Sequence, residues 1–183
     1  MSWYRRNYVP GGTYFFTVVT YRRQPILLSD LARTCLRTAI EKIRLTYPFE
    51  IFAFVLLADH LHTVWILPPN DDRYSLRWRR IKEEFTREYL RKGGQDLEPS
   101  ISRVRRGEQG VWHRRFWEHT VRDNDDLKAA ADYIHWNPVK HKLVERASDW
   151  EWSSFQRFIT LGEYPPEWGR EDPNPGYDTP EWG

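Results

Sequence analysis

Two histidines one residue apart are the first feature of this sequence that could carry out chemistry. They are His60 and His62, and they stand inside the apolar run at residues 51–67, IFAFVLLADHLHTVWIL. Side chains alternate between the two faces of a β-strand, so both imidazoles would point the same way. Two imidazoles on one rigid apolar strand can share a divalent cation, and the pair therefore suggests a metal site.

A histidine pair is a weak motif by itself, because each ring can instead fill a hydrogen-bonded niche at a strand end. A metal site needs a third ligand, and a candidate lies in residues 133–138, YIHWNP. In a helix, Tyr133 and Asn137 would lie one turn apart on the same face, where they could offer a nucleophile and a metal ligand. The plain alternatives are a tyrosine at the edge of the core and an asparagine that caps the helix.

The composition indicates one domain with an unusual number of aromatic rings. A chain of 183 residues can bury one core. Aromatic residues make up 16%, with ten Trp and ten Tyr, which is more than such a core uses, so some rings should be exposed. Exposed rings among 28 Lys and Arg are typical of sites for single-stranded nucleic acid.

The net charge of +2 hides an uneven distribution. Six acidic residues and one arginine follow Gly162, a charge of −5 that leaves +7 on the first 162 residues. A basic body fits a polyanionic partner. The single cysteine, Cys35, excludes a disulfide framework and a Cys-rich zinc site, and it favours a reducing compartment. Because we find no apolar signal core and no run of ~18 apolar residues, we expect a soluble, intracellular protein without membrane contact.

The first half of the chain must position the histidines. Residues 1–12 are expected to form a basic aromatic arm and a turn. Residues 13–21, TYFFTVVTY, predict a central strand that is buried on both faces. A helix should follow, with Ser29 as N-cap and its end before Pro48. The histidine-bearing run then divides into two strands at Ala58-Asp59.

The second half must position the tyrosine. We expect a basic helix over residues 75–91, a polar loop over 93–110, a strand over 111–121, and a helix that Asp123 caps and Pro138 ends. A short helix at 153–161 would complete a domain of residues 1–162, followed by a flexible, acidic, Pro-rich tail at 163–183. This order predicts an α+β, ferredoxin-like split β-α-β domain, with an antiparallel sheet, helices on one face and an extra C-terminal helix that carries the tyrosine.

Basic and aromatic residues outside the predicted core are candidates for DNA binding. They come from the arm, the basic helix, the strand at 111–121 and the stretch after the tyrosine: Trp3, Tyr4, Arg5, Arg6, Arg73, Arg77, Arg80, Arg114, Arg115, Lys140 and Lys142. The alternatives are a mobile terminus for the arm and a solvated face for the helix.

Several of these stretches together resemble the REP-associated tyrosine transposases, which are HUH single-strand nucleases. The resemblance rests on His60-Leu61-His62 and on the stretches PGGTYFFTVVT, VWHRRFWEHTVRD, YIHWNPVKHKLV and DWEWSSF, and it covers about residues 4–155 in the same order. One departure is Leu57-Ala58, where the family often has Met-Pro.

The resemblance implies a ferredoxin-like domain in which His60, His62 and Asn137 hold one divalent metal. Tyr133 would attack the phosphate of a single strand beside a hairpin and leave a 5′-phosphotyrosine and a free 3′-hydroxyl. The implied function is DNA transposition at REP-type hairpins in the bacterial cytoplasm, at the nucleoid. The implied state is a monomer whose tyrosine acts in cis, with a dimer left open.

Elementary chemistry agrees with these roles. A metal with open positions neutralises the charge that develops in phosphodiester cleavage. Two imidazoles and an amide oxygen suit Mg²⁺ or Mn²⁺, whereas the absence of thiolates argues against structural zinc. Because free tyrosine titrates near ~10, Tyr133 needs a base or a nearby positive charge, for which Lys140, His141 and Lys142 are all candidates.

Two other functions would use the same domain differently. A hairpin DNA-binding protein without cleavage activity would need neither His60 nor Tyr133. A metal-dependent phosphodiesterase that uses water would keep the histidines and ignore the tyrosine.

Overall fold

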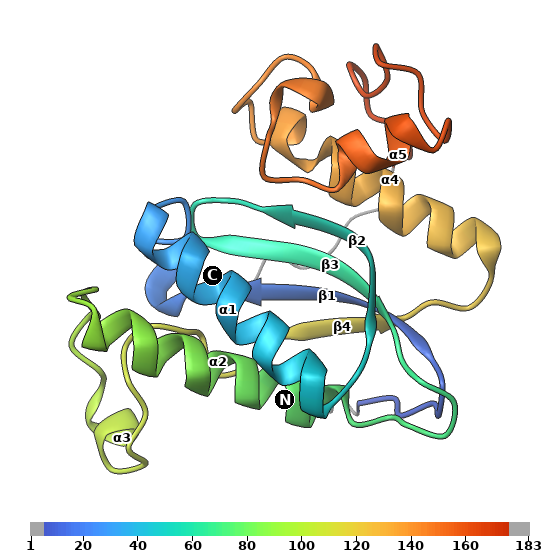
Figure 1. Ribbon diagram of the computed structural model, residues 1–183. Coiled ribbons are helices and arrows are strands. Elements are labelled where there is room, and N and C mark those ends of the chain that lie inside the picture. The colour runs from blue at the N-terminus through green and yellow to red at the C-terminus, as the bar shows by residue number, and fades with distance from the viewer. Residues whose placement is uncertain (1–5, 176–183) are drawn as a thin grey trace.

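The computed structural model describes residues 6–175, and its centre is a four-stranded antiparallel sheet with the order β2-β3-β1-β4 (Figure 1). The strands are β1 (Thr13–Val19), β2 (Glu50–Leu56), β3 (His60–Ile66) and β4 (Trp117–Thr120). β1 lies between β3 and β4 and is buried after its first residue, as its β-branched and aromatic composition predicted. The predicted antiparallel ferredoxin-like sheet is confirmed.

Helices cover both faces of the sheet. The helices α1 (Asp30–Thr46) and α2 (Tyr74–Arg91) pack on one face, where they share a core with Phe16 of β1. The helices α4 (Asn124–Lys140) and α5 (Phe155–Thr160) pack with Phe15 on the other face. α4 is the additional C-terminal helix that carries Tyr133, and its position opposite α1 and α2 could not be read from the order of elements. In residues 6–175 we find no helix that is long and apolar enough to cross a bilayer.

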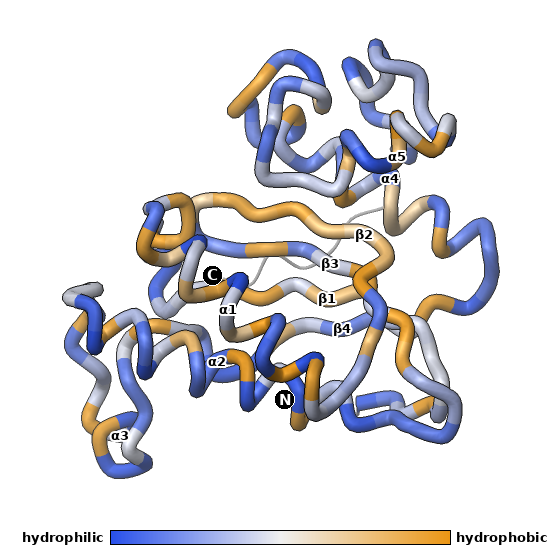
Figure 2. The backbone as a smooth tube through the Cα atoms, in the orientation of Figure 1, coloured by the Kyte–Doolittle hydropathy of each residue, from blue (hydrophilic) through white to orange (hydrophobic). Residues whose placement is uncertain are grey.

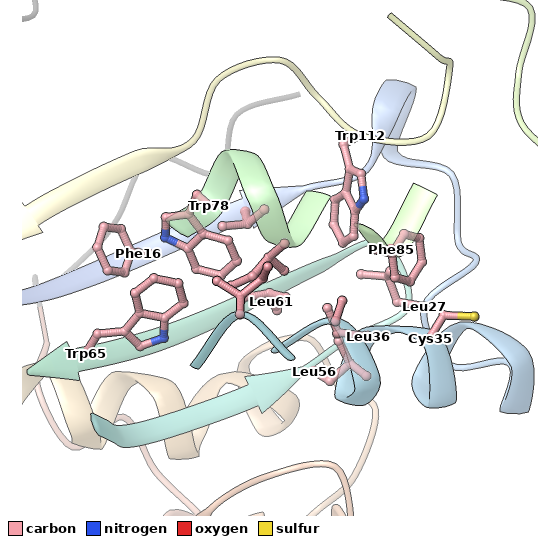
Figure 3. Close-up of a cluster of buried hydrophobic side chains, with 14 of the residues drawn as sticks. Phe16, Leu27, Cys35, Leu36, Leu56, Leu61, Trp65, Trp78, Phe85 and Trp112 are labelled. Atoms are coloured by element: carbon pink, nitrogen blue, oxygen red, sulfur yellow. The ribbon is translucent and has the colours of Figure 1, made fainter. Parts of the chain in front are cut away.

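The larger core lies between the sheet and α1 and α2 (Figure 3). Trp65 of β3 stacks on Trp78 of α2 with ring centroids 4.2 Å apart, and Phe16 meets both indoles edge-on. Such aromatic pairs add about 0.5 to 1.5 kcal/mol each beyond the area that they bury. β2 is apolar over nearly its whole length, whereas α2 mixes hydrophilic and hydrophobic residues along its length (Figure 2).

Two predicted segments differ from the structure. The strand expected over 111–121 is the shorter β4, preceded by one isolated bridge between Trp112 and Thr20. The consecutive Arg114 and Arg115 are exposed, and because two adjacent charged residues cannot both face solvent in a sheet that is covered on two sides, the ladder is interrupted there. The loop expected over 93–110 contains the one-turn helix α3 (Ile101–Val104).

Pro138 does not end the helix as predicted, because α4 continues through it to Lys140. A proline inside a helix leaves the carbonyl four residues earlier without its usual donor. Near the helix end this costs little, since the following amides close the last turn: His141 N donates to Asn137 O, and Leu143 N donates to Pro138 O.

Two aromatic residues that follow Gly162, Tyr164 and Trp168, pack on the domain. Tyr164 is buried, its hydroxyl donates to Asp132 Oδ1 of α4 at 2.6 Å, and Trp168 stacks on its ring at 4.3 Å. The acidic, Pro-rich composition concealed these two aromatic anchors. Tyr164 therefore helps to fix the position of α4.

Candidate active site

His60 and His62 lie side by side on the face of β3 that α4 covers. Their side chains share this face with Val64, while Leu61 and Trp65 point into the other core. The two imidazole centroids are 4.9 Å apart, and both residues are buried. The alternation of the strand thus brings the two rings together as the sequence predicted.

Each histidine is held through its Nδ1 atom. His60 Nδ1 is 2.6 Å from Asp59 Oδ1, and His62 Nδ1 is 2.9 Å from the hydroxyl oxygen of Thr17, its partner in the register with β1. Burial raises the pKa of Asp59, but the hydrogen bond to His60 and the charge of Arg23 outweigh burial, so this pKa lies below its usual range. Since an ionised carboxylate only accepts, His60 Nδ1 carries the hydrogen of this contact, and Nε2 lies on the opposite side of the ring.

α4 runs directly over the histidine pair. The ring centroid of Tyr133 is 5.4 Å from that of His62, and the ring centroid of His141, directly after the helix, is 5.4 Å from that of His60. Asn137 is four residues from each of these contacts, so it occupies the turn between them on the same face of the helix. Tyr133, Asn137 and His141, each one helical turn from the next, therefore lie along the two histidines of β3.

Tyr133 is buried rather than surrounded by open space. Its side chain is 2% exposed and meets Phe15 edge-on at 5.9 Å. Lys140 Nζ donates to its hydroxyl oxygen at 3.1 Å and lies 4.8 Å from the ring centroid. Of the three candidates for activating Tyr133, the structure places Lys140 at the hydroxyl, His141 at His60, and Lys142 at an exposed position.

The residues present fit a divalent ion. Among the described residues, no hydrogen-bond partner reaches His60 Nε2 or the side-chain atoms Oδ1 and Nδ2 of Asn137, although both side chains are buried. Buried polar atoms are nearly always paired, so these atoms indicate a ligand between them. In the described part of the chain, no group of three or more His, Cys, Asp or Glu could hold a metal, and a site here depends on Asn137 beside the two histidines.

The candidate DNA-binding residues fall into different environments. Arg73, Arg80, Arg114 and Arg115 are exposed, and Arg6 is half-buried beside Phe116, with its guanidinium carbon 4.0 Å from the ring centroid. Trp3, Tyr4 and Arg5 lie outside the described residues.

The prediction that Arg77 binds DNA is wrong, because its side chain is fully buried. Its guanidinium donates to Asp71 Oδ1 at 2.8 Å and to the backbone oxygen of Pro48 at 2.8 Å. It therefore ties α2 to the loop before β2 and has no donor turned toward a DNA phosphate. Helical spacing alone could not distinguish it from its exposed neighbours.

Sequence reasoning missed the two residues that orient the histidines. Asp59 directly precedes His60, and that adjacency was a usable signal, since metal-binding histidines commonly donate to a carboxylate. Thr17 had no signal in the sequence, because its contact with His62 depends on the register between β1 and β3.

Proteins of similar sequence identify the family of this chain. The profile of the family described as "Transposase IS200 like" matches residues 9–137. The REP-associated tyrosine transposase of Escherichia coli (strain K12) is 42% identical over 168 residues, which are 92% of this chain and 91% of that protein. A relative from Haemophilus influenzae is 43% identical over 169 residues, which are 92% of this chain and 94% of that one.

A solved structure extends the match to three dimensions. It is described as the REP-associated tyrosine transposase bound to a REP hairpin, and it shares 40% identity with this chain at a TM-score of 0.77, covering 95% of this chain and 94% of its own. The chain therefore belongs to the IS200-like transposase family and is an enzyme of the REP-associated tyrosine transposase group.

Proposed function

We propose that this enzyme nicks and rejoins single-stranded DNA beside a hairpin, with Tyr133 as the covalent nucleophile. The observation that carries the proposal is the packing of Tyr133 against His62, since the two residues come from elements far apart in sequence. DNA binding alone does not require a tyrosine and a histidine pair to be buried against each other. The alternative of hairpin binding without cleavage leaves this convergence unexplained.

Tyr133 has the surroundings of a nucleophile. Attack forms a bond between its phenolic oxygen and the phosphorus and breaks the bond from phosphorus to the 3′-oxygen, which leaves as a hydroxyl once protonated. An ammonium beside a phenol favours the phenolate, so Lys140 at 3.1 Å would support loss of the phenolic proton. Rejoining reverses the step, when a 3′-hydroxyl attacks the phosphotyrosine and releases Tyr133.

His60, His62 and Asn137 would hold one Mg²⁺ or Mn²⁺ ion. Such an ion, when bound, offsets negative charge on the phosphate and on the leaving oxygen. Asp59 and Thr17 fix the imidazole rings through Nδ1, so that the opposite nitrogen of each ring can face the phosphate side of the site. Because α4 covers this site, its last turns also limit the access of water to Tyr133.

The DNA partner is proposed from the relative that was solved with a REP hairpin. Exposed Arg114, Arg115 and Lys142 would contact phosphates of this DNA, and exposed Arg73 and Arg80 of α2 would do so on the other face of the sheet. Tyr133 lies against His62 of its own chain, which supports a tyrosine that acts in cis in a monomer.

The direct test is to incubate the protein with end-labelled hairpin DNA and Mn²⁺ and to look for a protein-DNA adduct that survives denaturing electrophoresis. Wild type should form the adduct. Tyr133→Phe should not, while its hairpin affinity should persist, because the ring and its packing remain. An adduct in Tyr133→Phe would assign another nucleophile, and hairpin binding without any wild-type adduct would favour the protein that only binds.

A further inference from the structure

A second concave site lies on the other face of the sheet. It is a pocket of about 760 Å³ between α2, the loop that carries α3 and residues 112–116. Its walls include Trp78 and Phe116, which meet Phe16 edge-on, whereas Tyr133 and His62 pack with Phe15 on the opposite face. The volume lies within the range of about 300 to 1,000 Å³ that small-molecule sites occupy. The pocket is therefore separate from the candidate active site.

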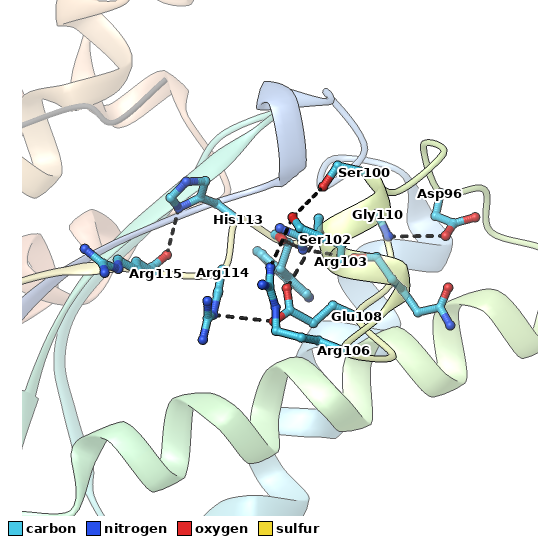
Figure 4. A network of polar contacts seen from close by, with 12 residues as sticks. Asp96, Ser100, Ser102, Arg103, Arg106, Glu108, Gly110, His113, Arg114 and Arg115 are labelled. Carbon is cyan, nitrogen blue, oxygen red and sulfur yellow. Dashed lines mark hydrogen bonds and ion pairs between the residues drawn. The ribbon is translucent and has the colours of Figure 1, made fainter.

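The pocket carries an excess of positive charge. Seven arginine and lysine side chains line it, against two carboxylates. One of these, Glu108, is shared by Arg106, Arg114 and Arg103 at 2.9, 3.4 and 3.8 Å (Figure 4). A single carboxylate cannot neutralise three guanidinium groups, so the pocket attracts anions.

Lys82 is a basic residue of the pocket with two arginines, Arg6 and Arg103, close enough to affect its charge. It is half-buried, and its Nζ donates to the backbone oxygen of His113 at 2.9 Å. Burial and, after it, the charges of Arg6 and Arg103 lower its pKa to about 7. Within residues 6–175 no carboxylate pairs with it. A bound anion would remove this mutual repulsion.

Aromatic rings stand beside the basic groups. Lys82 Nζ is 5.7 Å from the ring centroid of Phe116 and 5.9 Å from that of Trp112. Trp78 and Trp112 also line the pocket. Aromatic rings beside basic groups are typical of sites for single-stranded nucleic acid, where a base stacks on a ring and the phosphate meets the positive charge.

We propose that this pocket binds one unpaired nucleotide of single-stranded DNA, with its phosphate against Arg6 and Lys82 and its base beside Phe116 and Trp112. The inference rests on the proposed function, for which it supplies a second anchoring point on the substrate strand. An unpaired nucleotide can place both its base and its phosphate inside a pocket, whereas a duplex keeps its bases stacked and offers phosphates outside it.

The edge of the sheet connects the two sites. β4 is an edge strand, and its first residue, Trp117, packs edge-on against Phe15 on the face of the active site. The preceding residue, Phe116, faces the pocket. A DNA strand that leaves the pocket thus needs to cross only this edge, past exposed Arg114 and Arg115, to reach the side of Tyr133.

The test compares Lys82→Gln with Lys92→Gln, which removes an equal charge from an exposed position at the end of α2 outside the pocket. The probes are single-stranded oligo-dT and a blunt duplex of equal length. Lys82→Gln should weaken oligo-dT binding about tenfold or more, the usual effect of losing a hydrogen bond to a charged group. It should also reduce the slope of log affinity against log salt by about 0.7. Duplex binding should stay as in wild type.

Two further variants keep the result interpretable if Lys82→Gln unfolds, which a thermal melt would reveal. Arg6→Gln changes the arm and should weaken oligo-dT binding in the same selective way. Lys82→Arg keeps the charge and should recover most of the affinity. The proposal is overturned if folded Lys82→Gln and Arg6→Gln bind oligo-dT as wild type does, or if oligo-dT and duplex affinity fall together.

The adduct experiment distinguishes the pocket from the proposed function. If wild type forms no adduct but its oligo-dT affinity depends on Lys82, the proposed nuclease function is overturned and the nucleotide pocket stands. If wild type forms the adduct but its oligo-dT affinity does not depend on Lys82 or Arg6, only the nucleotide pocket is overturned.

Discussion

Lys140 Nζ donates a hydrogen bond to the hydroxyl of Tyr133 at 3.1 Å, two helical turns along the same face of α4. The helix thus supplies both a tyrosine and the positive charge beside it. Because both residues are fixed to one rigid helix over the histidine pair, their relative position does not depend on loop motion.

We predict that Lys140→Gln slows adduct formation on the order of 100-fold near neutral pH, as when one donor that stabilises developing negative charge is lost. The deficit should shrink as the pH rises toward the range in which tyrosine ionises without help. The measurement is the adduct rate as a function of pH. The control is Lys128→Gln, which removes an exposed lysine of the same helix that pairs with Asp132. An equal loss at every pH would show that Lys140 does not act through the phenol.

Asn137→Ala should raise the Mn²⁺ concentration that half-saturates cleavage by roughly 10 to 100-fold. The amide atoms of Asn137 make no hydrogen bond within the described residues, so little stability should depend on them. A metal titration of adduct formation, run beside a thermal melt, separates the two possible roles of this side chain. An unshifted metal midpoint with a lower melting temperature would make Asn137 structural.

Arg77→Met should destabilise the fold by about 3 kcal/mol, because it leaves Asp71 without its buried partner. The hydrogen bond from Arg77 is the main reason that the pKa of Asp71 lies well below its usual range. A carboxylate with a lowered pKa contributes stability above its unfolded pKa and loses it as the pH falls through the lower value. Denaturant unfolding at several pH values would measure this. Arg80→Met, at an exposed position, should unfold like wild type.

His135 should make the fold sensitive to mild acid. Burial lowers the pKa of His135 to about 3. Its Nε2 atom lies 2.7 Å from the hydroxyl oxygen of Ser154. The unfolded chain takes up the proton first, near a pH of about 6.5, so stability should fall progressively between that pH and about 3. Unfolding free energies from neutral to acid pH should show this slope in wild type and a shallower slope in His135→Gln. A slope that His135→Gln leaves intact would assign it to other groups.

The sequence by itself determined the parts of the site that depend on local periodicity. A strand period of two places His60 and His62 on one face, and a helical period places Tyr133 and Asn137 one turn apart, whatever surrounds them. The apolar pattern likewise predicted a central β1 and the amphipathic α1. These features are fixed by chain geometry, so they needed no knowledge of contacts.

Only the tertiary structure decided which of several equivalent side chains meet. Lys140, His141 and Lys142 are consecutive, and their different positions at Tyr133, at His60 and in solvent follow from how α4 packs and ends. Arg77 looked like any exposed arginine of α2, yet the loop before β2 encloses it. Tyr164 belonged to a tail of disordered composition, yet Asp132 holds it. Such contacts form only when helices and strands pack against one another. The local sequence pattern therefore cannot predict them.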